Sequence, residues 1–192
     1  MSQRNLLTQP CWTAKDRGQA LPDSTHAVSV ALPRWDDVIA YEEKDPFLLN
    51  QLRSVYPRFG LNPLVDKIAQ VARERSSWHN CSAWPYPDSI TANKARAHCQ
   101  ASQSTGTTYI SEVFGLYCLI ADEQATPAAK AFWQHTGLGI SSRAAAIELG
   151  LEDSLPKSLV NEKHQIIKNR ISKSTKTDSN NIHLTSSGMS AL

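Results

Sequence analysis

Two glycine-rich turns in this sequence have residue types that can hold an anionic group. The first is Ser187-Gly188-Met189, which follows the apolar residues Ile182 and Leu184. Glycine lets the backbone approach a ligand closely, and the free N–H groups of a helix beginning after Met189 would bind a phosphate. Turns of this composition also connect elements without any ligand, so both interpretations stand.

The second turn runs from Gly137 to Arg143 and contains Gly139. Glycines before a serine-capped helix could cradle an anion, and the guanidinium of Arg143 could pair with it. A plain connection between two helices explains the same residues equally well.

Tyr56 and Arg58 form a third candidate, in a segment that also contains Pro57. Two residues apart in an extended chain, a phenol and a guanidinium could reach the same phosphate. A packed tyrosine and a surface arginine are the alternative.

A metal site is not expected from the cysteines and histidines. Two histidines lie near cysteines, in His79-Asn80-Cys81 and His98-Cys99, but the spacing matches no compact zinc pattern. The four cysteines, Cys11, Cys81, Cys99 and Cys118, are irregularly spaced, as in a chain that keeps its thiols reduced.

Composition narrows the possible function classes. The chain has 192 residues, 41% hydrophobic and 20% charged, which suits a globular protein with a core. Its net charge of +2 does not suggest a nucleic-acid-binding surface, although the lysine-rich stretch 157–176 leaves that alternative open. Without an apolar signal-type start or a membrane-length apolar run, the sequence predicts a cytoplasmic protein that does not associate with membranes.

The sequence pattern of the N-terminal part predicts a strand and three helices. Residues 26–33 alternate in hydrophobicity like a strand, and 35–43 predict a short helix or a turn. Asp45-Pro46 and Asn62-Pro63 are each a cap followed by proline, which is typical of a helix start. The expected apolar faces of these two helices are Leu48, Leu49, Leu52 and Val55, and then Leu64, Val65, Ile68, Val71 and Ala72.

The remainder predicts further helices and two adjacent strands. Residues 76–87 lack periodicity and predict an ordered loop, whereas Asp88 is expected to cap a helix over 89–102. Further helices are expected between Thr126 and Gly137, from Ser141 or Ser142 to Gly150, and after Pro156. The predicted strands are 107–110 and 113–121, of which the second could instead be helical, and a further short strand is expected at 182–186.

Together, several of these motifs resemble the fungal-type cystathionine gamma-synthases, pyridoxal-phosphate enzymes of cysteine and methionine metabolism. The resemblance spans about residues 26–192 and covers only the N-terminal part of that family. The motifs that carry it are His26–Val30, Trp35, Tyr41-Glu42-Glu43, Tyr56-Pro57-Arg58-Phe59, Ala131–Gly137, Gly139–Arg143 and Ser187-Gly188-Met189.

The resemblance implies an α/β chain that forms the N-terminal segment of a fold type I, aspartate-aminotransferase-like enzyme. Such a segment is rich in helix with few strands, and the large cofactor domain is cut off. The chain would divide into a flexible arm at 1–25, an N-terminal arm at 26–75, an insertion at 76–156, and the start of the cofactor domain at 157–192.

The resemblance also implies pyridoxal 5′-phosphate as cofactor. Tyr56 and Arg58 would reach across a dimer interface to the phosphate of the neighbouring subunit. The N–H groups of Gly188 and Met189 would bind the phosphate in their own subunit. The family's cofactor-binding lysine falls beyond Leu192, and Lys176 precedes the phosphate turn, so no catalytic residue is expected in this chain.

The implied reaction is γ-replacement, in which cysteine displaces the ester group of an activated homoserine. The full-length enzyme would be a homodimer or tetramer acting on a small amino-acid substrate in transsulfuration and methionine biosynthesis. The alternative is a non-catalytic module, derived from the same family, that binds a ligand or a partner.

Overall fold

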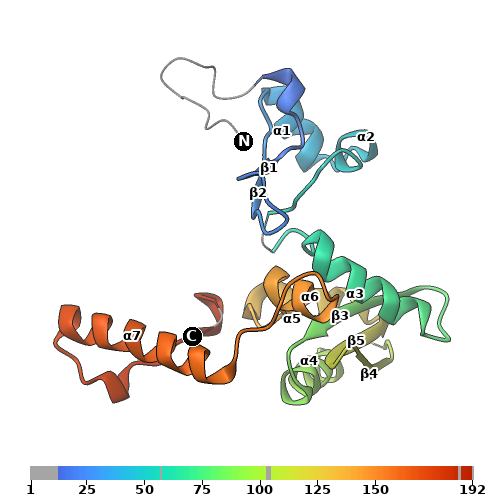
Figure 1. The fold of residues 1–192 in the computed structure, drawn as a ribbon. Helices are drawn as coiled ribbons and strands as arrows, with labels where there is room; N and C mark the ends of the chain where they lie inside the picture. Colours follow the sequence, from blue (N-terminus) through green and yellow to red (C-terminus); the bar gives the residue numbers. More distant parts are fainter. Residues whose placement is uncertain (1–12, 57, 103–104, 186, 192) are drawn as a thin grey trace. The chain divides into compact units, whose positions relative to one another are not determined.

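The computed structural model describes residues 13–56, 58–102, 105–185 and 187–191, which fall into two compact units, Met1–Lys67 and Ile68–Leu192 (Figure 1). The arm expected at 1–25 is described only from residue 13 onward. Residues 1–12, 57, 103–104, 186 and 192 lie outside the described residues, and among them are Cys11, Pro57, Ser186 and Leu192. The division of the chain into four parts stays a prediction.

In its described residues, the first unit contains two short strands and two helices before α3 begins. After a 3-10 turn at Ala14–Asp16, β1 (Ala20–Leu21) pairs antiparallel with β2 (Ser29–Val30). Helix α1 (Trp35–Glu42) follows where a helix was predicted, but the strand predicted over 26–33 is only two residues long. Beyond β1 and β2 the two segments stay joined by backbone hydrogen bonds, from the Ala31 N–H to the Gln19 carbonyl at 2.8 Å and from the Gly18 N–H to the Ala31 carbonyl at 2.9 Å.

Helix α2 (Pro46–Leu49) begins as predicted and ends early. The Asp45 carboxylate accepts a hydrogen bond of 2.9 Å from the N–H of Phe47. The predicted continuation through Leu52 and Val55 is wrong, because the backbone turns away to meet Gly18: the Arg53 N–H donates to the Gly18 carbonyl at 2.8 Å.

Helix α3 (Pro63–Glu74) confirms the cap-plus-proline signal. The Asn62 side-chain oxygen accepts from the N–H of Leu64 at 2.9 Å. Of the predicted apolar stripe, Leu64, Val65, Ile68 and Ala72 are buried, whereas Val71 is only half-buried. Ala69 is buried beside them.

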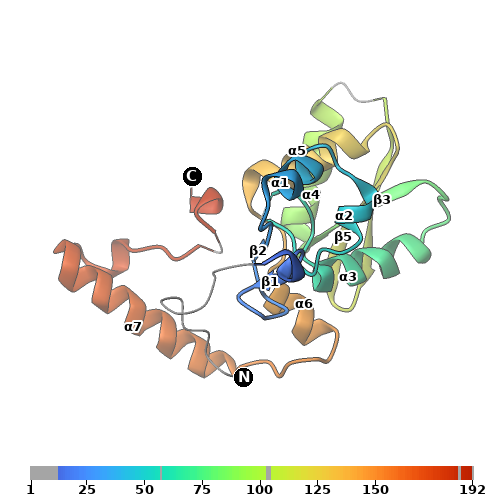
Figure 2. The same cartoon turned by 90° about the horizontal axis from the view of Figure 1, so that it is seen from above.

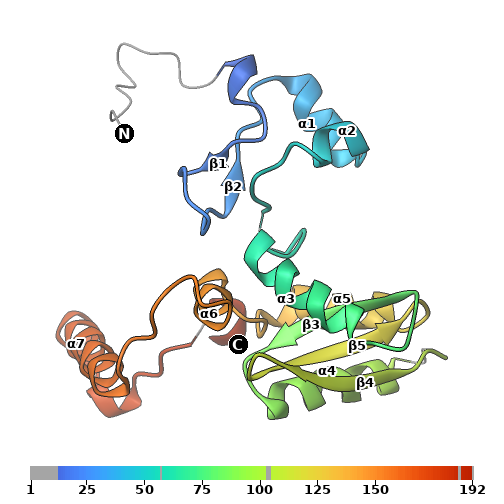
Figure 3. The ribbon, with the colours of Figure 1, turned by 45° about the vertical axis from the view of Figure 1, so that its right-hand side comes forward.

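The second unit is built on an antiparallel three-stranded sheet with the order β3-β5-β4. Its strands are β3 (Cys81–Tyr86), β4 (Thr108–Val113) and β5 (Leu116–Asp122). Phe114 and Gly115 both have positive φ and form the tight turn between β4 and β5. Figure 3 shows the sheet between α3 and α4 (Ser89–Ala101).

The central strand β5 is covered on both faces. The side chains from Cys118 to Ala121 alternate between the two faces, and all of them are fully buried. Helix α5 (Thr126–Thr136) packs on the face that carries Trp84 and Tyr86, with Trp84 and Trp133 ring centroids 5.3 Å apart. Helix α4 lies against α5 on this face, where the His98 and Phe132 rings are 5.5 Å apart, and α3 lies over the opposite face (Figure 3).

The ordered loop predicted at 76–87 is wrong, because Cys81–Tyr86 forms β3. Strand β3 lies at the edge of the sheet, where a proline is tolerated because its missing N–H is not needed by a neighbour. The carbonyl oxygen of Pro85 points away from β5 and accepts a hydrogen bond of 3.3 Å from the N–H of Ile140.

The helices predicted in the second unit are present. Asp88 caps α4 through a 2.7 Å hydrogen bond from the Thr91 N–H, Gly137 ends α5 with φ of 64°, and Ser141 caps α6 (Ser142–Glu148). Helix α7 (Lys157–Thr175) is a single long helix (Figure 2). In the part of the chain that is described, no helix is both long and apolar enough to cross a membrane.

The strand predicted over 182–186 does not form in residues 182–185. A 3-10 turn, η2 (Ser179–Asn181), precedes this stretch, and its described residues pair with no strand. Ile182 is buried without a strand partner. A second 3-10 turn, η3 (Met189–Ala191), follows.

Candidate functional site

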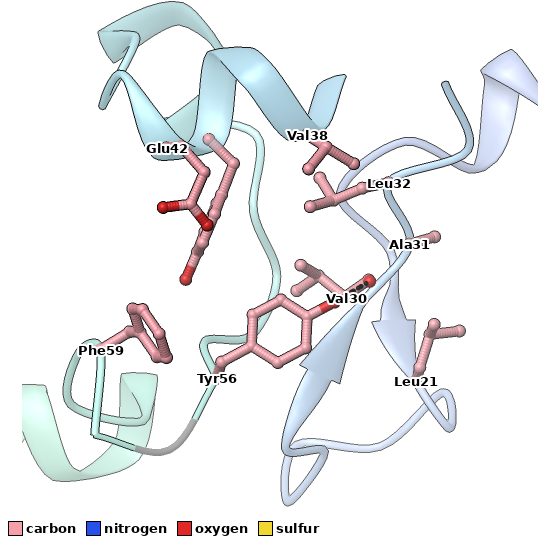
Figure 4. A pocket seen from close by; sticks show the side chains of 9 residues that line it. Leu21, Val30, Ala31, Leu32, Val38, Glu42, Tyr56 and Phe59 are labelled. Carbon is pink, nitrogen blue, oxygen red and sulfur yellow. Dashed lines mark hydrogen bonds between the residues drawn. The ribbon is translucent and has the colours of Figure 1, made fainter. Parts of the chain in front are cut away.

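Tyr56 is the predicted site residue with the most defined surroundings. Its hydroxyl donates a hydrogen bond of 3.0 Å to the carbonyl oxygen of Val30 in β2 (Figure 4). The side chain is half-buried, and its ring lies 5.7 Å from that of Tyr41 at an interplanar angle of 79°. The structure therefore directs Tyr56 toward the interior of the first unit.

Arg58, two residues further on, lies in a different environment. It is exposed and its φ of 73° is in the left-handed region. This backbone conformation reverses the chain immediately after Tyr56, so the two residues do not continue in one extended segment as the sequence predicted.

Tyr56 lines a hollow of about 470 Å³ that sequence reasoning missed. Tyr41 and Glu42 of α1 are among its lining residues. Phe59 lines it beside Tyr56 (Figure 4). Burial raises the pKa of Tyr41, with further contributions from Tyr56 and Glu42, so its phenol stays neutral. The remaining lining residues are apolar: Leu21, Val30, Ala31, Leu32 and Val38.

Gly188 and Met189 lie in a compact turn held by serine side chains. The Ser187 N–H donates to Ser190 Oγ at 3.0 Å, and the Ser190 N–H donates to Ser187 Oγ at 3.2 Å. These bonds leave the N–H groups of Gly188 and Met189 without an acceptor among the described residues. A side chain at Gly188 would meet nothing within 4 Å, so this backbone is open to solvent.

The two glycine-rich turns of the sequence contact each other. Ser187 Oγ donates to the carbonyl oxygen of Gly137 at 3.1 Å. A Cβ at Gly137 would lie 2.9 Å from the Cβ of Met189 and would also collide with Ser187 Oγ. The C-terminal end of α5 therefore supports the 187–190 turn, a contact between residues 50 positions apart that no local pattern signals.

Among the described residues, Arg143 forms no hydrogen bond or ion pair with either turn. Its side chain is exposed on α6, whose first turn is capped by a 3.1 Å hydrogen bond from the Ala144 N–H to Ser141 Oγ. This arrangement fits the simpler interpretation of 137–143, a capped connection between two helices.

The four predicted cofactor-binding residues fall into two groups. Tyr56 and Arg58 belong to the unit Met1–Lys67, and Gly188 and Met189 belong to Ile68–Leu192. The two residues of each pair lie close together in the sequence. That any of the four binds a cofactor stays a prediction. Within the described ranges, no three histidine, cysteine or acidic side chains gather in a way that could hold a metal ion.

Comparisons with known proteins connect this geometry to a family. Residues 64–141, from the start of α3 to the cap of α6, match the model of the fungal trans-sulfuration enzyme N-terminal domain. No solved structure gives a significant match.

Three curated relatives share the same part of the chain. A putative cystathionine gamma-synthase of Saccharomyces cerevisiae is 32% identical over 151 residues, covering 69% of this chain and 23% of the relative. A second protein of that yeast, a cystathionine gamma-synthase, is 28% identical over 161 residues, covering 73% and 25%. The cystathionine gamma-synthase of Neurospora crassa is 26% identical over 160 residues, covering 70% and 26%.

The chain spans about a quarter of the length of these relatives. The similarity covers most of the described residues, and the family-model match includes β3, β4, β5 and the Gly137 turn. The chain is thus related to the N-terminal part of the fungal-type cystathionine gamma-synthases, as its motifs predicted.

Proposed function

We propose that this chain serves as the N-terminal part of a pyridoxal-phosphate-dependent enzyme of the cystathionine gamma-synthase type. The reaction is the γ-replacement of an activated homoserine ester with cysteine. The observation that carries the proposal is the similarity of about 70% of the chain to the N-terminal quarter of cystathionine gamma-synthases.

The donor groups of the chain suit a phosphate. The adjacent N–H groups of Gly188 and Met189 have no acceptor in the described part of the chain and lie beside an open glycine face. Backbone donors of this kind bind phosphate oxygens. The Arg58 guanidinium adds forked donors. Tyr56 would have to release Val30 before its hydroxyl could donate to a phosphate.

In this proposal the residues of the chain bind and orient the cofactor phosphate, and none of them is assigned a catalytic role. Pyridoxal phosphate, when bound, supplies an electron sink for the substrate's reacting carbons. Ser187 and Gly137 hold the 187–190 turn in one conformation, so that Gly188 and Met189 present their N–H groups together. Tyr56 and Arg58 act on the phosphate of a neighbouring subunit, which makes a homodimer or tetramer part of the proposal.

A complementation assay tests the proposal. The chain is mixed with Saccharomyces cerevisiae cystathionine gamma-synthase lacking its N-terminal quarter, and cystathionine formation from a homoserine ester and cysteine is followed with added pyridoxal phosphate. We expect product from the mixture and none from either part alone. Activity of the chain alone would contradict the absence of catalytic residues. An inactive mixture, with the yeast enzyme's own N-terminal quarter restoring activity, would contradict the assignment.

Two arginines of the same unit provide a matched comparison in that assay. Arg58→Ala is expected to raise the concentration of pyridoxal phosphate needed for half-maximal activity by about tenfold or more, as for loss of a charge-assisted contact. Arg53→Ala, also at an exposed position, is expected to leave it unchanged. Equal effects of the two substitutions would remove Arg58 from the phosphate site.

A cytoplasmic location completes the proposal, because Cys81, Cys99 and Cys118 are free thiols, which suits a reducing compartment. No contact in the described residues favours the alternative of a non-catalytic binding module or a nucleic-acid role for the basic helix α7.

A further inference from the structure

The hollow beside Tyr56 differs from a plain apolar groove in its charge. Of the nine residues that line it, Glu42 is the only one with an acidic side chain, and none is basic. Glu42 extends from the end of α1 toward Phe59 at the opening (Figure 4). An anion would meet a carboxylate here, whereas a cation would be attracted to it.

Three aromatic rings surround the same opening without being parallel. The Tyr41 ring meets Tyr56 edge to face, with centroids 5.7 Å apart, and lies 6.4 Å from Phe59 at 52°. Rings set at such angles present both faces and edges to one space, and an aromatic face attracts a cation through its quadrupole. The Tyr56 hydroxyl bond to Val30 fixes the orientation of that ring.

We infer that this hollow binds a small organic cation with an alkylated ammonium head group. The rings of Tyr41, Tyr56 and Phe59 contact its methyl groups, and Glu42 balances its charge. The apolar wall formed by Val30, Leu32 and Val38 receives the alkyl part. A volume of about 470 Å³ lies within the usual range for sites that bind small molecules.

This site shares Tyr56 with the proposed cofactor contacts but needs it in a different state, because the cation site keeps the hydroxyl bond to Val30 that phosphate binding would break. It uses the ring of Tyr56 and not a free hydroxyl, and it lies wholly within the unit Met1–Lys67. Its ligand has the opposite charge to a phosphate, so a failure of one proposal leaves the other standing.

Choline and its uncharged carbon isostere, 3,3-dimethylbutan-1-ol, distinguish charge recognition from simple apolar binding. Both are titrated into the full chain and followed by NMR chemical shifts or calorimetry. We expect choline to bind at least about tenfold more tightly, the gain typical of a cation over aromatic rings with a carboxylate nearby. Equal affinity, or no binding of choline at tens of millimolar, would overturn the inference.

Two neighbouring glutamates give a matched pair of variants. Glu42 lines the hollow and Glu43 does not, although both are exposed at the end of α1. Glu42→Gln should weaken choline binding about fivefold or more, and Glu43→Gln should leave it unchanged. Equal effects of the two substitutions would show that choline affinity depends on the net charge of the protein and not on this site.

The ring of Tyr41 is tested separately. Tyr41→Phe keeps the ring and should keep choline affinity, whereas Tyr41→Leu should reduce it about fivefold. Circular dichroism and thermal unfolding verify that each variant is folded. Retained binding in a folded Tyr41→Leu variant would exclude an aromatic site.

Discussion

The hydroxyl of Ser187 donates a hydrogen bond of 3.1 Å to the carbonyl oxygen of Gly137, at the point where α5 ends. Gly137 has φ of 64°, and a side chain there would strike Ser187 and Met189. The glycine therefore has two separate functions: it ends the helix, and it leaves room for the 187–190 turn.

Replacing Gly137 with alanine is expected to destabilise the protein by about 2–4 kcal/mol, from left-handed backbone strain plus steric collision. Gly150→Ala is the matched control, because Gly150 has a similar φ of 69° but nothing within 4 Å of a Cβ. That substitution should cost only about 1 kcal/mol of strain. Urea unfolding measures both, and equal losses would show that the Ser187 contact adds nothing.

Two tyrosines of the second unit should respond in opposite ways to loss of their hydroxyls. Tyr86 is fully buried, and its hydroxyl has no hydrogen-bond partner among the described residues. Tyr86→Phe should therefore leave the free energy of unfolding within about 0.5 kcal/mol or raise it, because an unsatisfied buried group is removed.

The Tyr109 hydroxyl, by contrast, donates to Ser76 Oγ at 2.8 Å. Tyr109→Phe should lower the free energy of unfolding by about 1 kcal/mol. Chemical denaturation of both variants tests the pair. A larger loss at Tyr86 than at Tyr109 would mean that a buried partner, such as an internal water, satisfies Tyr86.

The buried thiol of Cys118 makes stability depend on pH in the alkaline range. Burial raises its pKa to about 12, whereas an unfolded thiol titrates at about 8.5. The folded state keeps the proton that the unfolded state loses, so this contribution is complete below about pH 8.5 and falls by about 1.4 kcal/mol per pH unit above it.

Urea unfolding between pH 8 and pH 11 measures how steeply the free energy of unfolding falls with pH in the wild type and in two cysteine variants. Cys118→Ala should flatten the decline, whereas alanine at the partly exposed Cys81 should leave the wild-type slope. An unchanged slope in Cys118→Ala would show that Cys118 does not remain protonated in the folded state.

Asp122 makes stability depend on pH in the acidic range. Its carboxylate accepts hydrogen bonds from the N–H of Thr107 at 2.6 Å and of Ala125 at 2.8 Å, and these bonds lower its pKa. The stabilisation is present above the unfolded value near 3.9 and is lost as pH falls through the lower folded value. Asp122→Asn should cost about 1 kcal/mol at pH 7, and the difference from wild type should shrink toward pH 2. A constant difference would contradict this.

The parts of the fold that were predicted correctly are those whose signals are local. Asp88 and Asn62 each accept a hydrogen bond from an N–H two or three residues later, so the cap lies next to the helix it starts. Gly137 and Gly150 end their helices through a backbone conformation that depends mainly on residue type. Such features are visible in a short window of sequence.

The parts that were missed depend on distant neighbours. Strand β3 exists because Cys81–Tyr86 pairs residue by residue with β5, more than 30 positions away, and its own composition of tryptophan and proline gives no alternating pattern. The early end of α2 depends on Gly18, and the hollow depends on Tyr41 meeting Tyr56 and Phe59. Only tertiary packing brings these residues together.

Pro85 lies in the edge strand β3 and limits how this sheet can associate with another chain. A strand at an edge normally offers N–H and carbonyl groups to any further chain, but Pro85 offers no N–H, and Ile140 already occupies its carbonyl. A fourth strand cannot find a continuous ladder beside β3. The protein therefore carries its own protection against β-sheet aggregation on that side of the molecule, supplied by a residue that would disrupt any strand in the middle of a sheet.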